Sequence, residues 1–294
     1  MPSAICFGEV LWDIFPTYKN IGGAPLNVAF RLQSFGVSTS IISRIGDDKN
    51  GHDILQYLND EGVDTANIQL DKFNKTGSVQ VILDNNGSAQ YEIEYPVAWD
   101  KIEVTESAVE ATKYADAFIF GSLACRDDIT KNTLLELLQH STYKVFDVNL
   151  RPPFYDMEFL LKLMNEADFI KCNDEELDEI CLALNFSSSS IREQLDFLSQ
   201  RTQTDKICTT LGKDGAVLLY DYQFYKNSGY PVKVADTVGA GDSFLATLVS
   251  QLLYSKEPEE ALNYACAVGA LVASKEGANP ELFDVDISDM ISSS

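Results

Sequence analysis

The chain has 294 residues and is 45% hydrophobic, enough for one large α/β domain with a sizeable core. Its formal net charge of −23 argues against nucleic acid and anionic membranes as partners, because both bind basic surfaces. No apolar run approaches the ~20 residues of a membrane span, and no basic segment opens the chain as in a signal peptide, so we expect a cytoplasmic protein.

Cysteine and histidine usage limits the chemistry further. The six cysteines are scattered, form no C-x-x-C pair and lie mostly in apolar stretches, so we expect buried thiols in a reducing compartment. The only histidines are His52 and His140, and the sequence has no H-E-x-x-H motif. A zinc site is therefore not expected.

The beginning of the chain alternates between strand and helix patterns. Residues 4–14 form an apolar run, typical of a buried strand, that continues into polar residues. A helix is expected at 25–35, a second strand at 39–45 and a short helix at 52–60. This alternation predicts a parallel sheet with helices packed on its faces.

A hairpin pattern then interrupts the alternation. The segments 76–83 and 89–95 both alternate in polarity, and residues 84–88 between them carry an Asn-Gly turn signal, so we expect a β-hairpin. A lone hairpin is not stable by itself.

The hairpin therefore needs further strands. We expect it to join the residues that follow Trp12 in a small sheet that forms a lid, built from about 12–24 and 70–100. The free strand edges of such a lid need covering, so we expect a homodimer that forms through it.

Alternation resumes after residue 100. Strands are expected at 117–120, 144–148, 169–171, 206–210 and 216–220, and helices at 131–140, 158–165, 175–184, 244–254 and 259–274. A short β-like run at 232–234 precedes the helix at 244–254. We find no internal repeat and no linker long enough to split the core, so residues 1–294 are expected to form a single domain.

The segment 236–244, Asp-Thr-Val-Gly-Ala-Gly-Asp-Ser-Phe, places two glycines at the start of a helix. Glycine lets backbone approach a ligand, and the first N–H groups of a helix bind anions. A carboxylate at Asp242 would repel a phosphate, so we interpret it as a base that takes the proton of an attacking hydroxyl. The alternative is that Asp242 is only a helix cap.

A second glycine pair, Gly22 and Gly23, precedes the helix at 25–35. Asn27 is a polar residue in the apolar start of that helix, which indicates a polar partner, and Asp13 is a further polar candidate on the lid side of the first strand. The alternative is a simple turn with an asparagine whose hydrogen bonds are satisfied within the fold.

Two polar clusters follow predicted strands, where ligands bind in open α/β sheets. Arg151 can offer a bidentate fork to phosphate, or it can form a structural salt bridge. Asn173 and Glu176 have the spacing of a helix capping box, and the same two residues can hold water molecules around Mg²⁺. The sequence after Thr210 lacks the pattern of a P-loop, and Phe244 stands where a dinucleotide-binding motif needs glycine.

Taken together, these motifs resemble the ribokinase-like sugar kinases, also called the phosphofructokinase B family, over nearly the whole chain. The residues that carry the resemblance are 236–244, Gly22-Gly23 with Asn27, Asn173 with Glu176, and 210–212. The resemblance implies a three-layer α/β/α sandwich with a mainly parallel central sheet and a small β-sheet lid. Within the family, the sequence around Asp13, Asn27 and Arg151 is most similar to fructokinases.

The resemblance also implies roles for individual residues. The catalytic group comprises the base Asp242, an anion hole of Gly239, Ala240 and Gly241, and Arg151 near the transferred phosphoryl group. The residues implied for sugar binding are Asp13, Gly22, Gly23 and Asn27. Trp99, near the expected lid, is a further candidate because an aromatic face suits the apolar side of a sugar ring, and the alternative is that it belongs to the core of the lid. The residues implied on the nucleotide side are Asn173, Thr210, Gly212 and Asn279. Glu176 would hold Mg²⁺ through water, and Asp236 matches a monovalent-cation loop whose second half, near Glu281, departs from the family pattern.

We therefore expect an ATP-dependent carbohydrate kinase that uses Mg²⁺, with potassium activation left open, and that converts fructose to fructose 6-phosphate. One alternative is a kinase of ribose, 2-keto-3-deoxygluconate or a nucleoside. Another is a non-catalytic sugar-binding regulator with the same fold, although the intact Asp242 between flanking glycines weighs against it.

Overall fold

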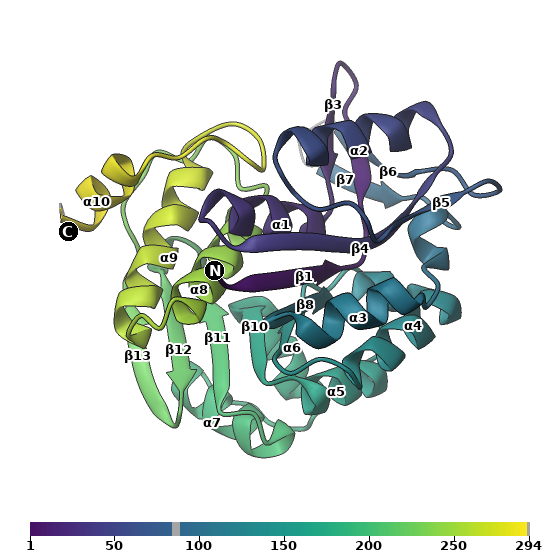
Figure 1. Ribbon diagram of the computed structural model, residues 1–294. Helices are drawn as coiled ribbons and strands as arrows, with labels where there is room; N and C mark the ends of the chain where they lie inside the picture. Colours follow the sequence, from purple (N-terminus) through teal and green to yellow (C-terminus); the bar gives the residue numbers. More distant parts are fainter. Residues whose placement is uncertain (84–88, 293–294) are drawn as a thin grey trace.

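The computed structural model describes residues 1–83 and 89–292, and a nine-stranded sheet runs through its centre between two layers of helices (Figure 1). The strands lie in the order β13-β12-β11-β10-β9-β8-β1-β4-β5. The seven strands from β11 to β5 are parallel, and β12 and β13 are antiparallel additions at one edge. Their bounds are β1 Ser3–Phe7, β4 Ser38–Gly46, β5 Ile68–Asp71, β8 Ala117–Gly121, β9 Lys144–Asp147, β10 Phe169–Asn173, β11 Lys206–Thr210, β12 Ala216–Tyr220 and β13 Gln223–Asn227.

Helices cover both faces of this sheet because its strands are apolar on both sides. In β1, Ala4 and Cys6 pack into one hydrophobic cluster, whereas Ile5 and Phe7 pack into the other. The first cluster includes α1 (Ala24–Ser34), α8 (Ala240–Leu253) and α9 (Pro258–Ala273). The helices on the second face are α3 Glu106–Tyr114, α4 Asp128–Leu138, α5 Met157–Glu166, α6 Asp174–Ala183 and α7 Ile191–Thr202. The remaining helices are α2 Lys49–Asp60 and α10 Asp284–Ser292.

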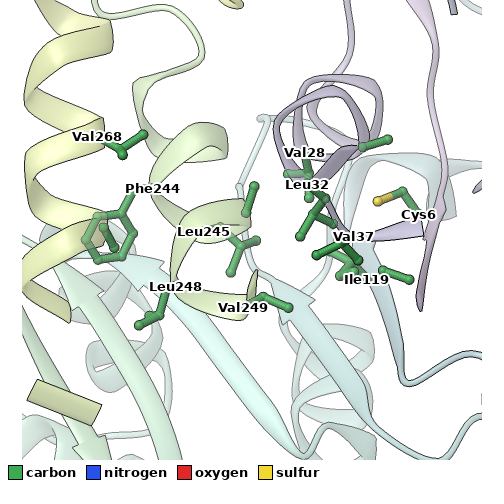
Figure 2. Close-up of a cluster of buried hydrophobic side chains, with 14 of the residues drawn as sticks. Cys6, Val28, Leu32, Val37, Ile119, Phe244, Leu245, Leu248, Val249 and Val268 are labelled. Atoms are coloured by element: carbon green, nitrogen blue, oxygen red, sulfur yellow. The ribbon is translucent and has the colours of Figure 1, made fainter. Parts of the chain in front are cut away.

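Helix α8 is the middle one of the three helices on the first face. It lies between α1 and α9, and Figure 2 shows Leu245 and Val249 directed toward Val28 and Leu32 of α1. Every residue from 243 to 250 is buried. Since each fully buried aliphatic side chain contributes about 1.5–3 kcal/mol, this packing fixes the position of α8 and of the residues at its N-terminus.

A separate four-stranded sheet, which we call the small sheet, stands beside the main one. Its order is β3-β2-β6-β7, with bounds β2 Leu11–Ile14, β3 Lys19–Gly22, β6 Gly77–Leu83 and β7 Ala89–Ile93. The antiparallel pairing of β6 with β7 confirms the predicted hairpin. Its predicted turn at 84–88 lies outside the described residues.

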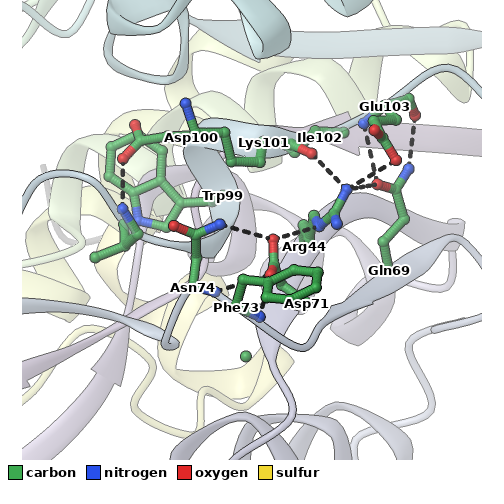
Figure 3. Close-up of polar contacts among 12 residues, drawn as sticks. Arg44, Gln69, Asp71, Phe73, Asn74, Trp99, Asp100, Lys101, Ile102 and Glu103 are labelled. Atoms are coloured by element: carbon green, nitrogen blue, oxygen red, sulfur yellow. Dashed lines mark hydrogen bonds and ion pairs between the residues drawn. The ribbon is translucent and has the colours of Figure 1, made fainter.

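Polar contacts attach the segments before β6 and after β7, which flank the small sheet, to the main sheet (Figure 3). Arg44, on β4, pairs with Asp71 (Nε to Oδ2, 2.8 Å) and donates to the Lys101 carbonyl oxygen (2.8 Å). Asp71 in turn accepts from the backbone N–H groups of Phe73 and Asn74, both at 2.8 Å. The loop after β5 is therefore held in one conformation even though the Phe73 side chain is 95% exposed.

Two predicted strands were wrong. The apolar run 4–14 is divided between β1 in the main sheet and β2 in the small sheet, because the chain turns at Gly8, where φ is 138°. The run 232–234 is not a strand: β13 ends at Asn227, and 232–234 pairs with no strand among the described residues. The chain reaches α8 through a loop instead.

The other expectations about the fold agree with the structure. The three layers, the mainly parallel sheet and the separate small sheet confirm the predicted fold class. All six cysteines are free and buried, as expected. In the described part of the chain, no helix is long and apolar enough to cross a membrane. That residues 1–294 form one domain with a lid from about 12–24 and 70–100 stays a prediction.

Candidate active site

The N-terminus of α8 is the centre of the candidate site. Gly239 is the cap residue, with a φ of 74°, and a Cβ there would lie 2.5 Å from the Ala278 carbonyl oxygen. Glycine is therefore required both by the backbone conformation and by the close loop. The Ala240 N–H donates to the Thr237 carbonyl (3.3 Å), whereas those of Gly241 and Asp242 make no hydrogen bond within the described residues. These two groups are free to bind an anion.

Asp242 lies one turn into α8 and is half-buried. Its Oδ2 accepts a hydrogen bond from Asn27 Nδ2 (2.7 Å), while its Oδ1 has no hydrogen bond from the described residues. Burial raises the pKa of Asp242 to about 6, and the charge of Asp147 adds to the rise. A carboxylate with a raised pKa and a free oxygen is suited to accept a proton near neutral pH.

The loop after α9 also contacts the residues of this site. Asn279 was predicted on the nucleotide side, but its Nδ2 donates to Asn27 Oδ1 (2.9 Å). Its Oδ1 is buried and has no hydrogen-bond partner among the described residues. Asn279 therefore contacts Asn27, which was predicted to bind the sugar, and retains one acceptor for a ligand.

Four of the five predicted sugar-binding residues, Asp13, Gly22, Gly23 and Asn27, lie where β2, β3 and α1 converge. Gly22 lies opposite Leu11 in the β2–β3 pair, and a Cβ on it would collide with the Asp13 carboxylate. Gly23 caps α1 with a φ of 110°, and a Cβ there would lie 2.5 Å from the Glu9 carbonyl oxygen. Burial raises the pKa of Asp13 to about 6, with a further contribution from Asp242. Gly22 thus makes room for the Asp13 carboxylate, which lies within electrostatic reach of the base.

A buried ion pair lies behind the site and was missed as a functional feature. Asp147 and Lys171 are register partners on β9 and β10, and Lys171 Nζ lies 3.0 Å from Asp147 Oδ1. A Cβ on Gly241 would lie 3.4 Å from Lys171 Nζ, so this cation borders the α8 loop. Burial lowers the pKa of Lys171, but the carboxylates of Asp147, Glu176 and Asp242 outweigh burial and hold it above its usual value.

Glu9 is a second group that sequence reasoning did not assign. It is 3% exposed, and its Oε2 is buried without a hydrogen-bond partner in the described part of the chain. Burial raises its pKa to about 7, although Arg151 opposes the shift. The available signal for Glu9, Asp147 and Lys171 was the same: a charged residue within or at the end of an otherwise apolar strand.

Asn173 and Glu176 form the capping box that was the alternative interpretation of their spacing. The Asn173 side chain accepts from the Glu176 N–H (2.8 Å), and Glu176 Oε2 accepts from the Asn173 N–H (2.9 Å). Glu176 Oε1 also accepts from the Leu150 N–H (2.8 Å) and so orients the loop that carries Arg151. Arg151 is exposed, and its positive charge opposes the rise in the pKa values of Asp13 and Asp242. It therefore lies on the solvent-exposed side of the site.

The remaining predicted residues lie around this centre. Thr210 ends β11 beside Asn173 of β10, and Gly212 has a φ of 57° with open space around its Cβ position. Trp99, in the 3₁₀ helix η1 (Ala98–Lys101), is 1% exposed and stacks on the Arg126 guanidinium, 3.9 Å from the ring centre. Trp99 therefore belongs to the packing beneath the small sheet.

Asp236 bridges the two loops that meet at Gly239. Its Oδ1 accepts from the Val238 N–H (3.0 Å) and its Oδ2 from the Gly277 N–H (3.2 Å). Near the second half of the predicted cation loop, Lys275 Nζ donates to the Glu281 carbonyl (2.8 Å). Across residues 1–83 and 89–292, no group of three or more His, Cys, Asp or Glu side chains could hold a metal ion.

Comparison with known proteins agrees with this fold. Fructokinase-2 of Solanum lycopersicum is 28% identical, in an alignment that covers 95% of this chain and 92% of the relative. A fructokinase double mutant from Vibrio cholerae O395, solved with fructose, ADP and potassium ion, superimposes with a TM-score of 0.85 at 23% identity, covering 99% and 98% of the two chains. Aminoimidazole riboside kinase from Salmonella enterica superimposes with a TM-score of 0.82 at 24% identity, covering 98% and 99%.

The architecture and the glycine-lined helix start define a ribokinase-like α/β protein. Residues 5–283 match the model of the pfkB family of carbohydrate kinases, and the chain belongs to that family. It is accordingly a sugar kinase.

Proposed function

We propose that this kinase transfers the γ-phosphoryl group of ATP to a hydroxyl of fructose, giving fructose 6-phosphate. The observation that carries the proposal is Asp242: a carboxylate with a raised pKa and a free oxygen, beside the unpaired N–H groups at the start of α8. A carboxylate placed there is unsuited to bind a phosphate and suited to deprotonate the hydroxyl that attacks one.

In the proposed reaction, Asp242 Oδ1 takes the hydroxyl proton as the sugar oxygen approaches the γ-phosphorus. The backbone at 239–241 and the Arg151 guanidinium stabilise charge on the equatorial oxygens, and Lys171 adds positive charge behind Gly241. Phosphoryl transfer depends mainly on such positioning and electrostatics. Enclosure of the site by the small sheet would exclude water and limit hydrolysis of ATP.

Mg²⁺, when bound, would neutralise negative charge on the phosphates of the nucleotide. Glu176 and Asn173 are its candidate water-mediated ligands, although each Glu176 oxygen already accepts one backbone N–H. Carboxylate oxygens have further lone pairs for water. The scarcity of direct ligands fits a metal that binds chiefly through the nucleotide.

The donor set does not fit a monovalent cation well. Both oxygens of Asp236 accept backbone N–H groups, and the Glu281 carbonyl accepts the Lys275 ammonium group. We therefore derive no step through potassium. Replacing potassium by tetramethylammonium in the assay should change the turnover less than twofold, and a strict potassium requirement would contradict this assessment.

Fructose is favoured over other acceptors by the fructokinase relatives and by the polar group formed by Asp13, Asn27 and Arg151. Ribose, 2-keto-3-deoxygluconate and nucleosides remain alternatives, and the likeness to a riboside kinase gives the last of them some support. A non-catalytic regulator would have no need of a base at Asp242.

We also propose a homodimer that forms through the small sheet. Phe73 is 95% exposed on a loop fixed by Asp71, and Tyr18 and Tyr95 are 55% and 54% exposed. A chain with a net charge of −23 repels a copy of itself. Lys72 and Lys75 flank Phe73 and reduce that repulsion locally.

The deciding experiment is a coupled ADP-release assay with a panel of acceptors, which compares kcat/KM for fructose, ribose, 2-keto-3-deoxygluconate, adenosine and fructose 6-phosphate. We expect fructose to give the highest value. A higher value for another acceptor would replace fructose but keep the kinase, whereas no turnover with any of them would reject this substrate range.

A further inference from the structure

Helix α1 contacts the residues around the proposed base through two side chains that lie one turn apart. Asn27 and Arg31 are four residues apart, so they occupy the same face of α1. Asn27 Nδ2 donates to Asp242 Oδ2 (2.7 Å), and Arg31 Nε donates to the hydroxyl of Ser243, the next residue of α8 (3.2 Å). Two consecutive residues at the start of α8 are therefore fixed to α1.

The same two side chains hold the loop that follows α9. Asn279 Nδ2 donates to Asn27 Oδ1 (2.9 Å), and Arg31 Nη2 donates to the carbonyl of Pro280, the next residue of the loop (2.9 Å). Asn27 and Arg31, which we call the α1 clamp, thus connect α8 with the C-terminal loop through two parallel sets of hydrogen bonds.

Arg31 is an unusual residue to find in this place. It is 1% exposed, and burial lowers its pKa to about 10. Among the described residues it forms no ion pair with a carboxylate, and its hydrogen bonds go to the Ser243 hydroxyl and the Pro280 carbonyl. A buried cation that is bonded to neutral oxygens costs stability that an apolar side chain would not. Its presence indicates a role in positioning the two segments.

The orientation of the Asn27 amide determines which of its atoms, Nδ2 or Oδ1, faces the Asp242 carboxylate. If the amide were rotated by 180°, its oxygen would face the carboxylate, and the attraction would become repulsion. The Asn279 N–H group needs an acceptor, so its bond to Asn27 Oδ1 selects the orientation that points Nδ2 at Asp242 Oδ2. That leaves Asp242 Oδ1 to receive the proton.

We propose that Asn279 and Arg31 are positioning residues for the base: Arg31 anchors the C-terminal loop, and Asn279 fixes the Asn27 amide so that one oxygen of Asp242 is held and the other faces the substrate. This inference rests on the proposed role of Asp242. It makes the C-terminal loop, whose contacts with α1 span 249 and 252 residues of the chain, part of the machinery that orients the proton acceptor.

The test is the pH dependence of kcat in Asn279→Ala. The hydrogen bond from Asn27 lowers the pKa of Asp242, so its weakening should raise that pKa. Loss of a hydrogen bond to a charged group shifts the pKa by about one unit, so we expect the acidic limb to move upward by up to that amount. The kcat at pH 6 should then fall by up to about fivefold, while KM for ATP changes less than twofold.

A double-mutant cycle separates positioning from a general loss of structure. The effect of Asn279→Ala should vanish in an Asn27→Ala background, because the amide that Asn279 orients is then absent. Arg31→Met, of similar length but uncharged, should move the limb in the same direction as Asn279→Ala. Glu276→Gln, an exposed change on the same loop, is the matched control and should leave the profile unchanged.

Two results would overturn the inference. One is an Asn279→Ala enzyme with a raised KM for ATP but an unchanged kcat and acidic limb, which would assign Asn279 to the nucleotide alone. The other is an equal effect of Asn279→Ala with and without Asn27. If an Asn279 variant is too unstable to assay, Arg31→Met and its cycle with Asn27→Ala decide the question.

A measurement that needs no catalytic turnover tests this inference independently of the proposed function. The carboxyl ¹³C resonance of Asp242, assigned by its absence in Asp242→Asn, reports the pKa of that group directly. An upward shift in Asn279→Ala supports the α1 clamp even if fructose proves to be the wrong substrate. An unchanged pKa contradicts it even if the enzyme phosphorylates fructose.

Discussion

The two sides of the proposed site are held in different ways. Asp242 lies at the start of a helix whose residues 243–250 are all buried, and the α1 clamp holds it through Asn27 and holds the next residue, Ser243, through Arg31. Asp13, in contrast, is carried by the small sheet, on which Tyr18 and Tyr95 are more than half exposed. A preorganised base costs no reorganisation during the reaction, whereas a small sheet with few buried contacts can move to admit the sugar. Substitutions on the first side should therefore affect kcat, and those on the second side should affect substrate binding.

Apart from replacement of Asp242 itself, the largest of these effects is expected at Gly241. A β-branched side chain in Gly241→Val would stand where phosphate must approach the free N–H groups of α8 and would crowd Lys171. Loss of one such donor costs about 10²–10³ in kcat, and we expect a loss of that size with little change in KM for fructose. Gly241→Ala is the matched control and should lose less, since its Cβ makes only ordinary contact at 3.4 Å. Equal kcat values for wild type and Gly241→Val in steady-state assays would remove the anion hole from the account.

A smaller effect is expected at Asp13, and it should affect substrate binding rather than kcat. Removal of a hydrogen bond from a charged group costs about 1.5–3 kcal/mol, so Asp13→Ala should lower kcat/KM for fructose about 10- to 100-fold. ATP binding, measured by calorimetry, should be unchanged. If Asp13→Ala instead weakens ATP binding and leaves KM for fructose as it was, Asp13 does not belong to the sugar side.

The pH dependence distinguishes the two sides as well. Asp242 must be ionised to act as a base, and its pKa is raised to about 6 by burial and the charge of Asp147. The kcat should therefore be constant above about pH 7 and fall about tenfold for each unit below pH 6. Because Asp13 has a similar pKa, the control is Asp13→Asn, which should keep the acidic limb of kcat. Disappearance of the limb in that variant would assign it to Asp13.

The smallest effect on catalysis is expected on the loop that joins β5 to the small sheet. Phe73→Ser removes an aromatic side chain that is 95% exposed in the single chain. If it is buried between two copies, its loss should weaken the dimer by about 1.5–3 kcal/mol, or roughly 10- to 100-fold in Kd, with little effect on unfolding of the monomer. Sedimentation of both proteins over a range of concentrations measures this. A wild-type chain that is monomeric at micromolar concentration and fully active would contradict the dimer.

Sequence patterns correctly predicted features that depend on residues close together in the chain. The glycines at 239 and 241 sit at the start of α8, and the alternating segments pair as β6 and β7. The run 4–14 was misjudged because apolar residues continue through Gly8, and only the separation into two sheets requires the turn there. The β-branched residues at 232–234 favour a strand, but no neighbouring strand pairs with them.

No sequence pattern predicted the α1 clamp. Arg31 contacts residues that are 212 and 249 positions away, and Asn279 contacts one that is 252 positions away. Such contacts follow from the packing of α1 against α8, not from any spacing along the chain. For the same reason the capping-box spacing of Asn173 and Glu176 was visible in the sequence, whereas the second contact of Glu176, with Leu150, was not.

The most direct test of the account is the rate of phosphoryl transfer in Asp242→Asn, measured in a single turnover with saturating ATP and fructose. The amide keeps the shape of the side chain and can cap a helix, but it cannot accept the proton. We expect the rate to fall about 10²–10⁴-fold, with an unchanged melting temperature and an unchanged Kd for ATP. A variant that transfers the phosphoryl group at nearly the wild-type rate would show that Asp242 is a structural residue and that the proton goes elsewhere.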